Sequence, residues 1–378
     1  MTLTLDRPGA QTEAAPPPIP TERADRYRVS VEEYIKFKRD GFLVVRNLVS
    51  PAEVAELRRH TEDLMQGRLP EQTHTMAEGT TPGSGTAVQG LEAPPAHLSP
   101  DEKVQYFLRI HMLHRRLELH ERYLLHPRVL DVLEALTGPD ILALQSMLFL
   151  KPAGKPGQGW HQDSFYIPTQ PDTLCGAWIA IDDADERNGA MWMAKGSGSE
   201  PVYPPGDGYG FGQGDLGGIA RVGGVSDPDD DKNDLSRIAD RYDQVLVSAR
   251  AGDVVFFGGH ILHRSKQNWT VDRVRRSFVG HYCNARSFTR WGADPNAAET
   301  VDSISGMTNG SHVLARGDTH LPFARPRFGT PCAALLSDAQ RREQSEGAAA
   351  MMGDMDSGLM GALPSGPDAP HDHGDGED

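Results

Sequence analysis

Two histidines and one aspartate have the residue types and the spacing of a metal site. His161 and Asp163 are separated by one residue in the segment 159–166, GWHQDSFY, which predicts a β-strand. Side chains two residues apart on a strand point to the same face, so an imidazole and a carboxylate would lie together. His263 follows much later, just after the apolar run at 253–257. Two imidazoles and one carboxylate leave three coordination positions open, which is the arrangement of non-haem iron(II) oxygenases.

Basic and hydroxyl side chains after His263 indicate a site for a carboxylate. Ser265 comes two residues after the histidine, and three arginines lead into the strand predicted over 277–284: Arg273, Arg275 and Arg276. A buried arginine beside a hydroxyl can bind a carboxylate through paired, charge-assisted hydrogen bonds. A dicarboxylate cosubstrate such as 2-oxoglutarate needs such a group at its far end.

Other histidines compete for these roles. His260 lies three residues before His263 in GGHILHRS, and we expect it to pack beside the site rather than to bind metal. Four further histidines stand among arginines in, or directly after, a segment that predicts a helix over 101–125: His111, His114, His120 and His126. This composition favours a solvated basic helix face over a second metal site.

The composition excludes several classes of protein. The 378 residues carry 53 acidic against 38 basic side chains, a formal net charge of −15, which argues against a nucleic-acid binder. The chain is 38% hydrophobic, enough for a sizeable core, yet no stretch predicts a membrane span or a signal peptide. Its three cysteines form no CxxC pair, which favours a reducing, cytoplasmic location.

The distribution of residue types predicts one domain between two tails. Residues 1–28 are rich in Pro, Ala and Thr, and residues 337–378 are acidic, so we expect both to be disordered. The domain would span 29–336, with a Gly- and Asp-rich insertion at 196–243 that has the length of a lid over a site.

Within this domain, helices precede strands. A helix is expected around 31–38, a strand at 41–49, a helix from Ser50 with a capping box, and another over 127–136. Short β-type runs separated by turns then dominate: 142–151, 159–166, 176–182, 189–195, 244–250, 253–257 and 277–284. Strands without intervening helices predict a mainly β protein with N-terminal helices and an antiparallel sandwich or barrel core.

Four segments together resemble the phytanoyl-CoA dioxygenase family of Fe(II)- and 2-oxoglutarate-dependent oxygenases, over residues 30–290. They are GFLVVRNLVSPAEVAEL, LKPAGKPGQGWHQDSFY, WIAIDDADERNGAMWMAKGS and AGDVVFFGGHILHRSKQN. The resemblance implies a double-stranded β-helix core of the jelly-roll, cupin-like type. It implies the cofactors Fe(II), 2-oxoglutarate and O2, and hydroxylation of an unactivated C–H of a small molecule with release of succinate and CO2.

The resemblance also implies roles for individual residues. His161, Asp163 and His263 match the iron ligands, and Ser265 with Arg275 matches the 2-oxoglutarate anchor, with Arg273 as the second candidate for the arginine. Three more residues match positions that line the cosubstrate or substrate cavity in relatives: Gln145, Lys151 and Trp178.

Two alternatives to hydroxylation stay open. The same iron ligands would serve desaturation, cyclisation or epimerisation, and the substrate is not identified by these residues. A cupin-like binding protein or non-redox metal enzyme could use the same barrel, but Ser265 and Arg275 would then have no evident role. No nucleic-acid or membrane partner is expected, and the sequence does not indicate an oligomeric state.

Overall fold

The computed structural model describes the chain at residues 23, 25–72, 88–89, 91–203, 235–289, 312–319, 324 and 328. All of these lie in one compact unit, Ile19–Ala334. The predicted C-terminal tail, most of the predicted N-terminal tail and residues 204–234 of the predicted insertion lie outside the described residues. The domain boundaries therefore stay predictions.

The helices of the first third begin where their capping residues predict. In α1 and α2 a serine accepts a hydrogen bond from the backbone N–H three residues on, and the glutamate there closes a capping box. Each of these helices ends at a left-handed glycine, Gly41 and Gly67. The helices are α1 (Val31–Asp40), α2 (Pro51–Gln66), α3 (Pro100–Val104), α4 (Glu118–Leu124), α5 (Pro127–Thr137), α6 (Asp163–Tyr166) and α7 (Leu235–Ala239), with 3-10 turns η1 (Leu113–Arg115) and η2 (Ser197–Ser199).

The strands form two main sheets, which confirms the predicted mainly β jelly-roll class. The larger sheet has the order β1 (Phe42–Val45), β10 (Val254–Gly258), β7 (Cys175–Ala180), β12 (Arg275–Asn284), β4 (Ile141–Lys151), β3 (Arg109–His111) and β2 (Val88–Gln89), with β14 (Val313–Arg316) also on β4. The smaller sheet has the order β5 (Gln158–His161), β11 (His263–Ser265), β8 (Met191–Ala194) and β9 (Gln244–Val247). A third pair joins β13 (Phe288–Thr289) to β6 (Thr169–Gln170). The pairings are antiparallel except that of β2 with β3.

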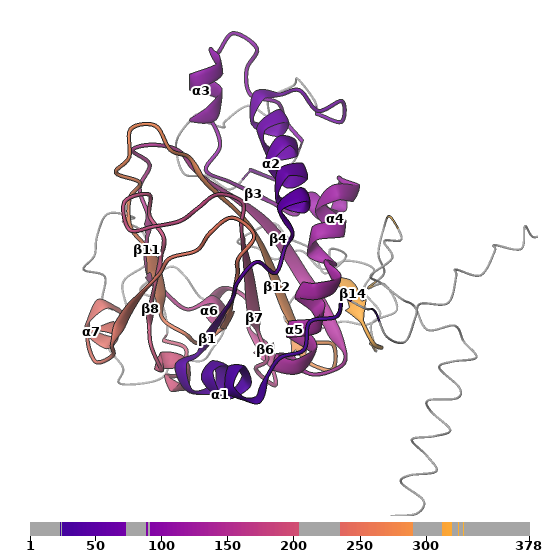
Figure 1. Ribbon diagram of the computed structural model, residues 1–378, viewed down its shortest axis with the longest axis vertical. Helices are drawn as coiled ribbons and strands as arrows, with labels where there is room; N and C mark the ends of the chain where they lie inside the picture. Colours follow the sequence, from indigo (N-terminus) through magenta and orange to yellow (C-terminus); the bar gives the residue numbers. More distant parts are fainter. Residues whose placement is uncertain are drawn as a thin grey trace, which may run out of the picture. The chain divides into compact units, whose positions relative to one another are not determined.

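Both faces of the larger sheet are buried, and alternate residues of its strands pack into different hydrophobic clusters. On β10, Val254 and Phe256 pack in the cluster that includes the helices, whereas Val255 and Phe257 pack with residues of the smaller sheet. Period-two alternation of this kind is how one strand serves two layers. In Figure 1 the helices α2, α4 and α5 lie along one side of β4 and β12, and β8 and β11 lie on the other. The interior between the two sheets is therefore where side chains from both can meet.

One predicted element is wrong. The expected helix over 101–125 is helical at α3 and α4, but the chain between them forms β3 and a 3-10 turn. The four histidines expected on a solvated face are buried instead: His111, His114, His120 and His126. The large apolar residues around them, including Met112, Leu113 and Leu117, are buried as well and draw the segment into the core.

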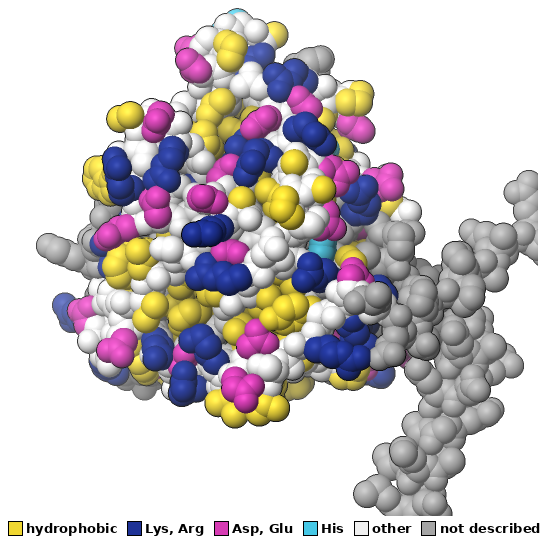
Figure 2. Space-filling model, viewed as in Figure 1, with side chains coloured by type: hydrophobic (Ala, Val, Ile, Leu, Met, Phe, Trp, Pro, Cys, Tyr) yellow, Lys and Arg dark blue, Asp and Glu magenta, His cyan; other side chains and the backbone are white. Residues whose placement is uncertain are grey.

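No helix in the described part of the chain is long and apolar enough to cross a membrane. On the face shown in Figure 2, side chains of both charge signs are intermingled rather than gathered by sign.

Candidate active site

The two histidines of the predicted metal site are cross-strand neighbours. His263 on β11 pairs with His161 at the end of β5, and their ring centroids lie 4.0 Å apart. A glycine permits the close approach of these strands, because a Cβ at Gly157 would lie 1.8 Å from the backbone oxygen of Ser265. The pairing brings two distant segments of the chain to one point of the interior.

Asp163 reaches the same point from a different element than predicted. The strand ends at His161, and Asp163 opens the short helix α6. Gln162 between them is extended, so the two side chains still point the same way. Gln162 itself points away and donates hydrogen bonds to the backbone oxygens of Pro201 and His260. The predicted strand 159–166 is therefore too long, because residues 163–166 form α6. The predicted juxtaposition of the His161 and Asp163 side chains is nevertheless present.

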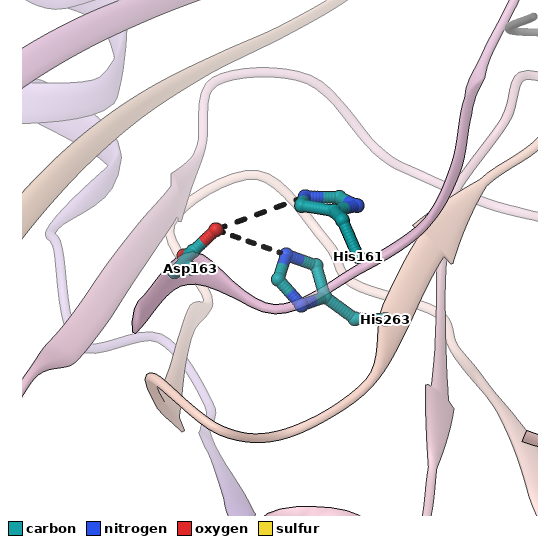
Figure 3. A group of neighbouring side chains, drawn as sticks. All are labelled: His161, Asp163 and His263. Atoms are coloured by element: carbon teal, nitrogen blue, oxygen red, sulfur yellow. Dashed lines mark ion pairs between the residues drawn. The ribbon is translucent and has the colours of Figure 1, made fainter. Parts of the chain in front are cut away.

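The three side chains converge on one small volume. Asp163 Oδ1 lies 3.7 Å from Nε2 of each histidine. Figure 3 shows the three side chains pointing toward one another, with a dashed line from Asp163 to each histidine. The ligand atoms of His161, Asp163 and His263 all lie within 4.8 Å of one another, the one such group of metal-binding side chains among the described residues. All three side chains are buried.

The hydrogen bonds of the histidines leave the metal-binding nitrogens free. Nδ1 of His161 lies 2.8 Å from the oxygen of Gly159, and Nδ1 of His263 lies 3.1 Å from the oxygen of Ile261. A carbonyl can only accept, so Nδ1 carries the proton and the lone pair of Nε2 faces Asp163. These contacts fix the tautomer that a metal ligand requires.

Electrostatics favour neutral imidazole and ionised carboxylate. Burial, with the neighbouring His263, lowers the pKa of His161 to about 3. Burial alone would raise the pKa of Asp163, but His263, His281 and His161 around it hold that pKa well below its ordinary value. The donor set therefore fits iron(II), which imidazole and carboxylate ligands bind with three positions left open.

A buried pair of cationic side chains lies where the last residue of β4 pairs with the first residue of β12. Lys151 and Arg275 are paired in register, are 7% and 3% exposed, and neither forms an ion pair among the described residues. Lys151 Nζ donates to Ser265 Oγ at 2.9 Å, and the Arg275 guanidinium lies 5.6 Å from the Trp178 ring. Burial lowers the pKa of Arg275 to about 10, and burial with the neighbouring Arg275 lowers that of Lys151.

This arrangement fits the far carboxylate of 2-oxoglutarate. Two desolvated cations in one place repel each other and are costly without an anion. Four of the five residues predicted for the cosubstrate meet here: Lys151, Trp178, Ser265 and Arg275. Gln145 does not, because it stands six residues from Lys151 along β4 and pairs with His281.

The two competing residues have other partners. Arg273 is engaged with both oxygens of Asp185 at 2.8 Å and is partly exposed. His260 forms an ion pair with Asp172, which raises its pKa, and contacts the oxygen of Glu200 at 2.6 Å. The geometry therefore supports Arg275 and His263 for the predicted roles.

Sequence reasoning missed one residue at the site. Nε2 of His281 lies 2.9 Å from Asp163 Oδ2, and the side chain is buried. The sequence held only part of the signal. His281 stands six residues after Arg275, so on an extended strand the two side chains share a face, but the contact with Asp163 depends on how the sheets pack.

Comparison with known proteins places this chain in a family. The family model described as phytanoyl-CoA dioxygenase matches residues 37–277. A peroxisomal phytanoyl-CoA dioxygenase of Bos taurus is 27% identical over 262 residues, covering 68% of this chain and 69% of the bovine protein.

Solved structures share the fold at low identity. The non-haem alpha-ketoglutarate-dependent epimerase SnoN from nogalamycin biosynthesis has a TM-score of 0.52 at 20% identity, covering 76% of this chain and 98% of SnoN. The carbocyclase SnoK from the same biosynthesis has a TM-score of 0.50 at 19% identity, covering 69% and 87%. With the family match spanning more than half of the chain, the protein belongs to the phytanoyl-CoA dioxygenase family and is an Fe(II)- and 2-oxoglutarate-dependent oxygenase.

Proposed function

We propose that this protein hydroxylates an unactivated C–H bond of a small-molecule substrate. His161, Asp163 and His263 would hold iron(II), and Lys151, Ser265 and Arg275 would anchor 2-oxoglutarate. The observation that carries the assignment is the pair of buried cations without an acidic partner in the described residues, in the same interior as the three converging ligands. A non-redox cupin-like protein would have no use for that pair.

Each residue has a defined task in this proposal. Bound iron(II) supplies activation of O2 coupled to oxidative decarboxylation of 2-oxoglutarate to succinate and CO2. The Nδ1 contacts of His161 and His263 hold their Nε2 lone pairs toward the site. Ser265 orients the Lys151 ammonium, and Arg275 with Trp178 forms the neighbouring wall. The apolar residues between the sheets, such as Met147 and Val279, exclude water from the reacting groups.

Hydroxylation is the expected outcome because it requires no catalytic residue beyond those that would hold iron(II) and 2-oxoglutarate. Two structural neighbours are named as an epimerase and a carbocyclase. We therefore expect the position of the bound substrate, and not the iron ligands, to decide the reaction outcome. Cytoplasmic location stays a prediction from the cysteine content.

A screen of metabolite extracts tests the proposal. Purified protein, iron(II), 2-oxoglutarate and O2 are incubated with the extract, and mass spectra are compared with those from the His161→Ala variant. A metabolite that gains one oxygen with formation of succinate supports hydroxylation. Loss of two hydrogens would indicate desaturation or cyclisation, and unchanged mass with succinate formation would indicate epimerisation. A metabolite-dependent mass change that persists without 2-oxoglutarate would contradict the cofactor assignment.

A further inference from the structure

A third imidazole contacts the candidate iron carboxylate from the larger sheet. His281 on β12 is 4% exposed, and its Nε2 lies 2.9 Å from Oδ2 of Asp163. His161 and His263 face the other oxygen, Oδ1, at 3.7 Å each. The two oxygens of one carboxylate therefore have different surroundings: one faces the converging ligands and the other faces His281.

The opposite side of the His281 ring is held as well. Nδ1 lies 3.1 Å from Nε2 of Gln145, the residue directly opposite His281 in the pairing of β4 with β12. The amide N–H donates to Nδ1, which places the ring proton of His281 on Nε2. That proton is then donated to Oδ2 of Asp163. Gln145, His281 and Asp163 thus form a directed chain of hydrogen bonds.

This chain limits how Asp163 can bind a metal. A carboxylate with both oxygens free can chelate an ion and occupy two of its positions, whereas one with Oδ2 engaged offers only Oδ1. In a six-coordinate site, three single-atom ligands leave three positions, which 2-oxoglutarate and O2 require together. A chelating Asp163 would remove one of those positions.

We propose that His281 is a positioning residue that keeps Asp163 a single-oxygen ligand of iron. The inference rests on the proposed function, in which Asp163 binds iron. Gln145 acts one step further out by orienting the His281 ring. Such outer hydrogen bonds orient metal ligands, and their loss commonly weakens metal affinity about 10- to 100-fold.

A purely structural His281 would behave differently. If its hydrogen bond served only the fold, then its removal would lower stability to the same degree with and without metal. A positioning role predicts instead that the loss appears in the binding of iron. The difference between the unfolding midpoints of the iron-loaded and metal-free protein measures this, because a ligand stabilises the folded state according to its affinity.

The experiment compares the His281→Leu and His281→Gln variants with wild type under anaerobic conditions. Iron(II) is titrated into metal-free protein, and thermal unfolding is recorded with and without iron(II). Cys283→Ala is the matched control, because Cys283 is buried on the same strand and is a free thiol. We expect iron(II) affinity about 10- to 100-fold weaker in His281→Leu, partly restored in His281→Gln, which keeps an N–H donor, and unchanged in the control.

The outcomes separate the inference from the function on which it rests. Wild-type affinity for iron(II) in His281→Leu, with wild-type protein that does bind iron, overturns the positioning role alone. Wild-type protein that binds no iron(II) overturns both. If His281→Leu fails to fold, His281→Gln is compared with His281→Asn, whose shorter side chain cannot reach Asp163. Equal iron(II) affinity in these two variants overturns the positioning role.

Discussion

At the scale of residues, the site combines an anionic ligand with two cations that have no acidic partner among the described residues. Asp163 is surrounded by three imidazoles, whereas Lys151 and Arg275 face each other across paired strands. Burying two like charges together destabilises the protein without 2-oxoglutarate, and a bound dicarboxylate would offset that cost. Binding and stability should therefore respond to the same substitution with opposite signs.

Replacing Arg275 with leucine tests this opposition. We expect the Arg275→Leu variant to bind 2-oxoglutarate at least about 30-fold more weakly, since loss of a buried charge partner commonly costs about 2–5 kcal/mol. The free energy of unfolding of the cofactor-free protein should stay equal or rise, because an uncompensated buried cation is removed. Calorimetric titration and urea unfolding measure the two quantities.

Arg273→Leu is the matched control for this variant. It removes a partly exposed pair with Asp185, so we expect a loss of stability of about 0–1 kcal/mol and unchanged 2-oxoglutarate binding. Weaker binding in Arg273→Leu and normal binding in Arg275→Leu would reverse the assignment of the anchor.

At the scale of elements, the even spacing of His161 and Asp163 predicted that their side chains would lie together, whereas the roles of Arg275, Lys151 and Gln145 were implied only by the resemblance to the family. Arg275 and Ser277 share one face of β12 with His281, and Gln145 and Lys151 share one face of β4. The strand β11 was too short to be recognised, although its histidine was identified. The helix expected over 101–125 failed because packing against the core overrode local propensity in its central part. That His281 contacts Asp163 depends on how the sheets stack, which local pattern does not encode.

The approach of β5 to β11 makes Gly157 an element-scale test. A methyl group there would overlap the oxygen of Ser265, so Gly157→Ala must separate the strands that carry His161 and His263. We expect weaker iron(II) binding and a loss of about 1–3 kcal/mol in the free energy of unfolding.

Gly198→Ala serves as the comparison, because an added Cβ would meet its nearest neighbour at an ordinary 3.8 Å. Iron(II) titration and urea unfolding of both variants check the prediction. Equal iron(II) affinity in Gly157→Ala and wild type would show that the spacing between β5 and β11 does not determine how the site binds iron(II).

At the scale of the whole molecule, buried histidines away from the candidate ligands link stability to pH. Burial lowers the pKa of His111 and His312 to about 3 and holds the pKa of His120 well below its ordinary value. Unfolded histidine has a pKa of about 6.5, so between these values the unfolded chain binds more protons than the folded one. The contribution of these histidines to the free energy of unfolding is therefore fully present above a pH of about 6.5 and is lost as the pH falls toward 3.

Urea unfolding of metal-free protein across this range measures the effect. Each such histidine should contribute up to about 1.4 kcal/mol per pH unit to the slope. His120→Gln should reduce the slope by about that amount, whatever its effect on stability at neutral pH. A free energy of unfolding that stays level from neutral pH down to about pH 4 would contradict the burial of these imidazoles.

The most direct test of the central claim is an anaerobic optical titration of the iron(II)-loaded protein with 2-oxoglutarate. Chelation of iron by the keto acid at three protein ligands should produce a visible charge-transfer band. We predict a band that saturates at one 2-oxoglutarate per protein, is absent in His161→Ala, and needs a higher 2-oxoglutarate concentration in Arg275→Leu. A wild-type protein that binds iron(II) but gives no band, or a band that persists unchanged in His161→Ala, would contradict the account.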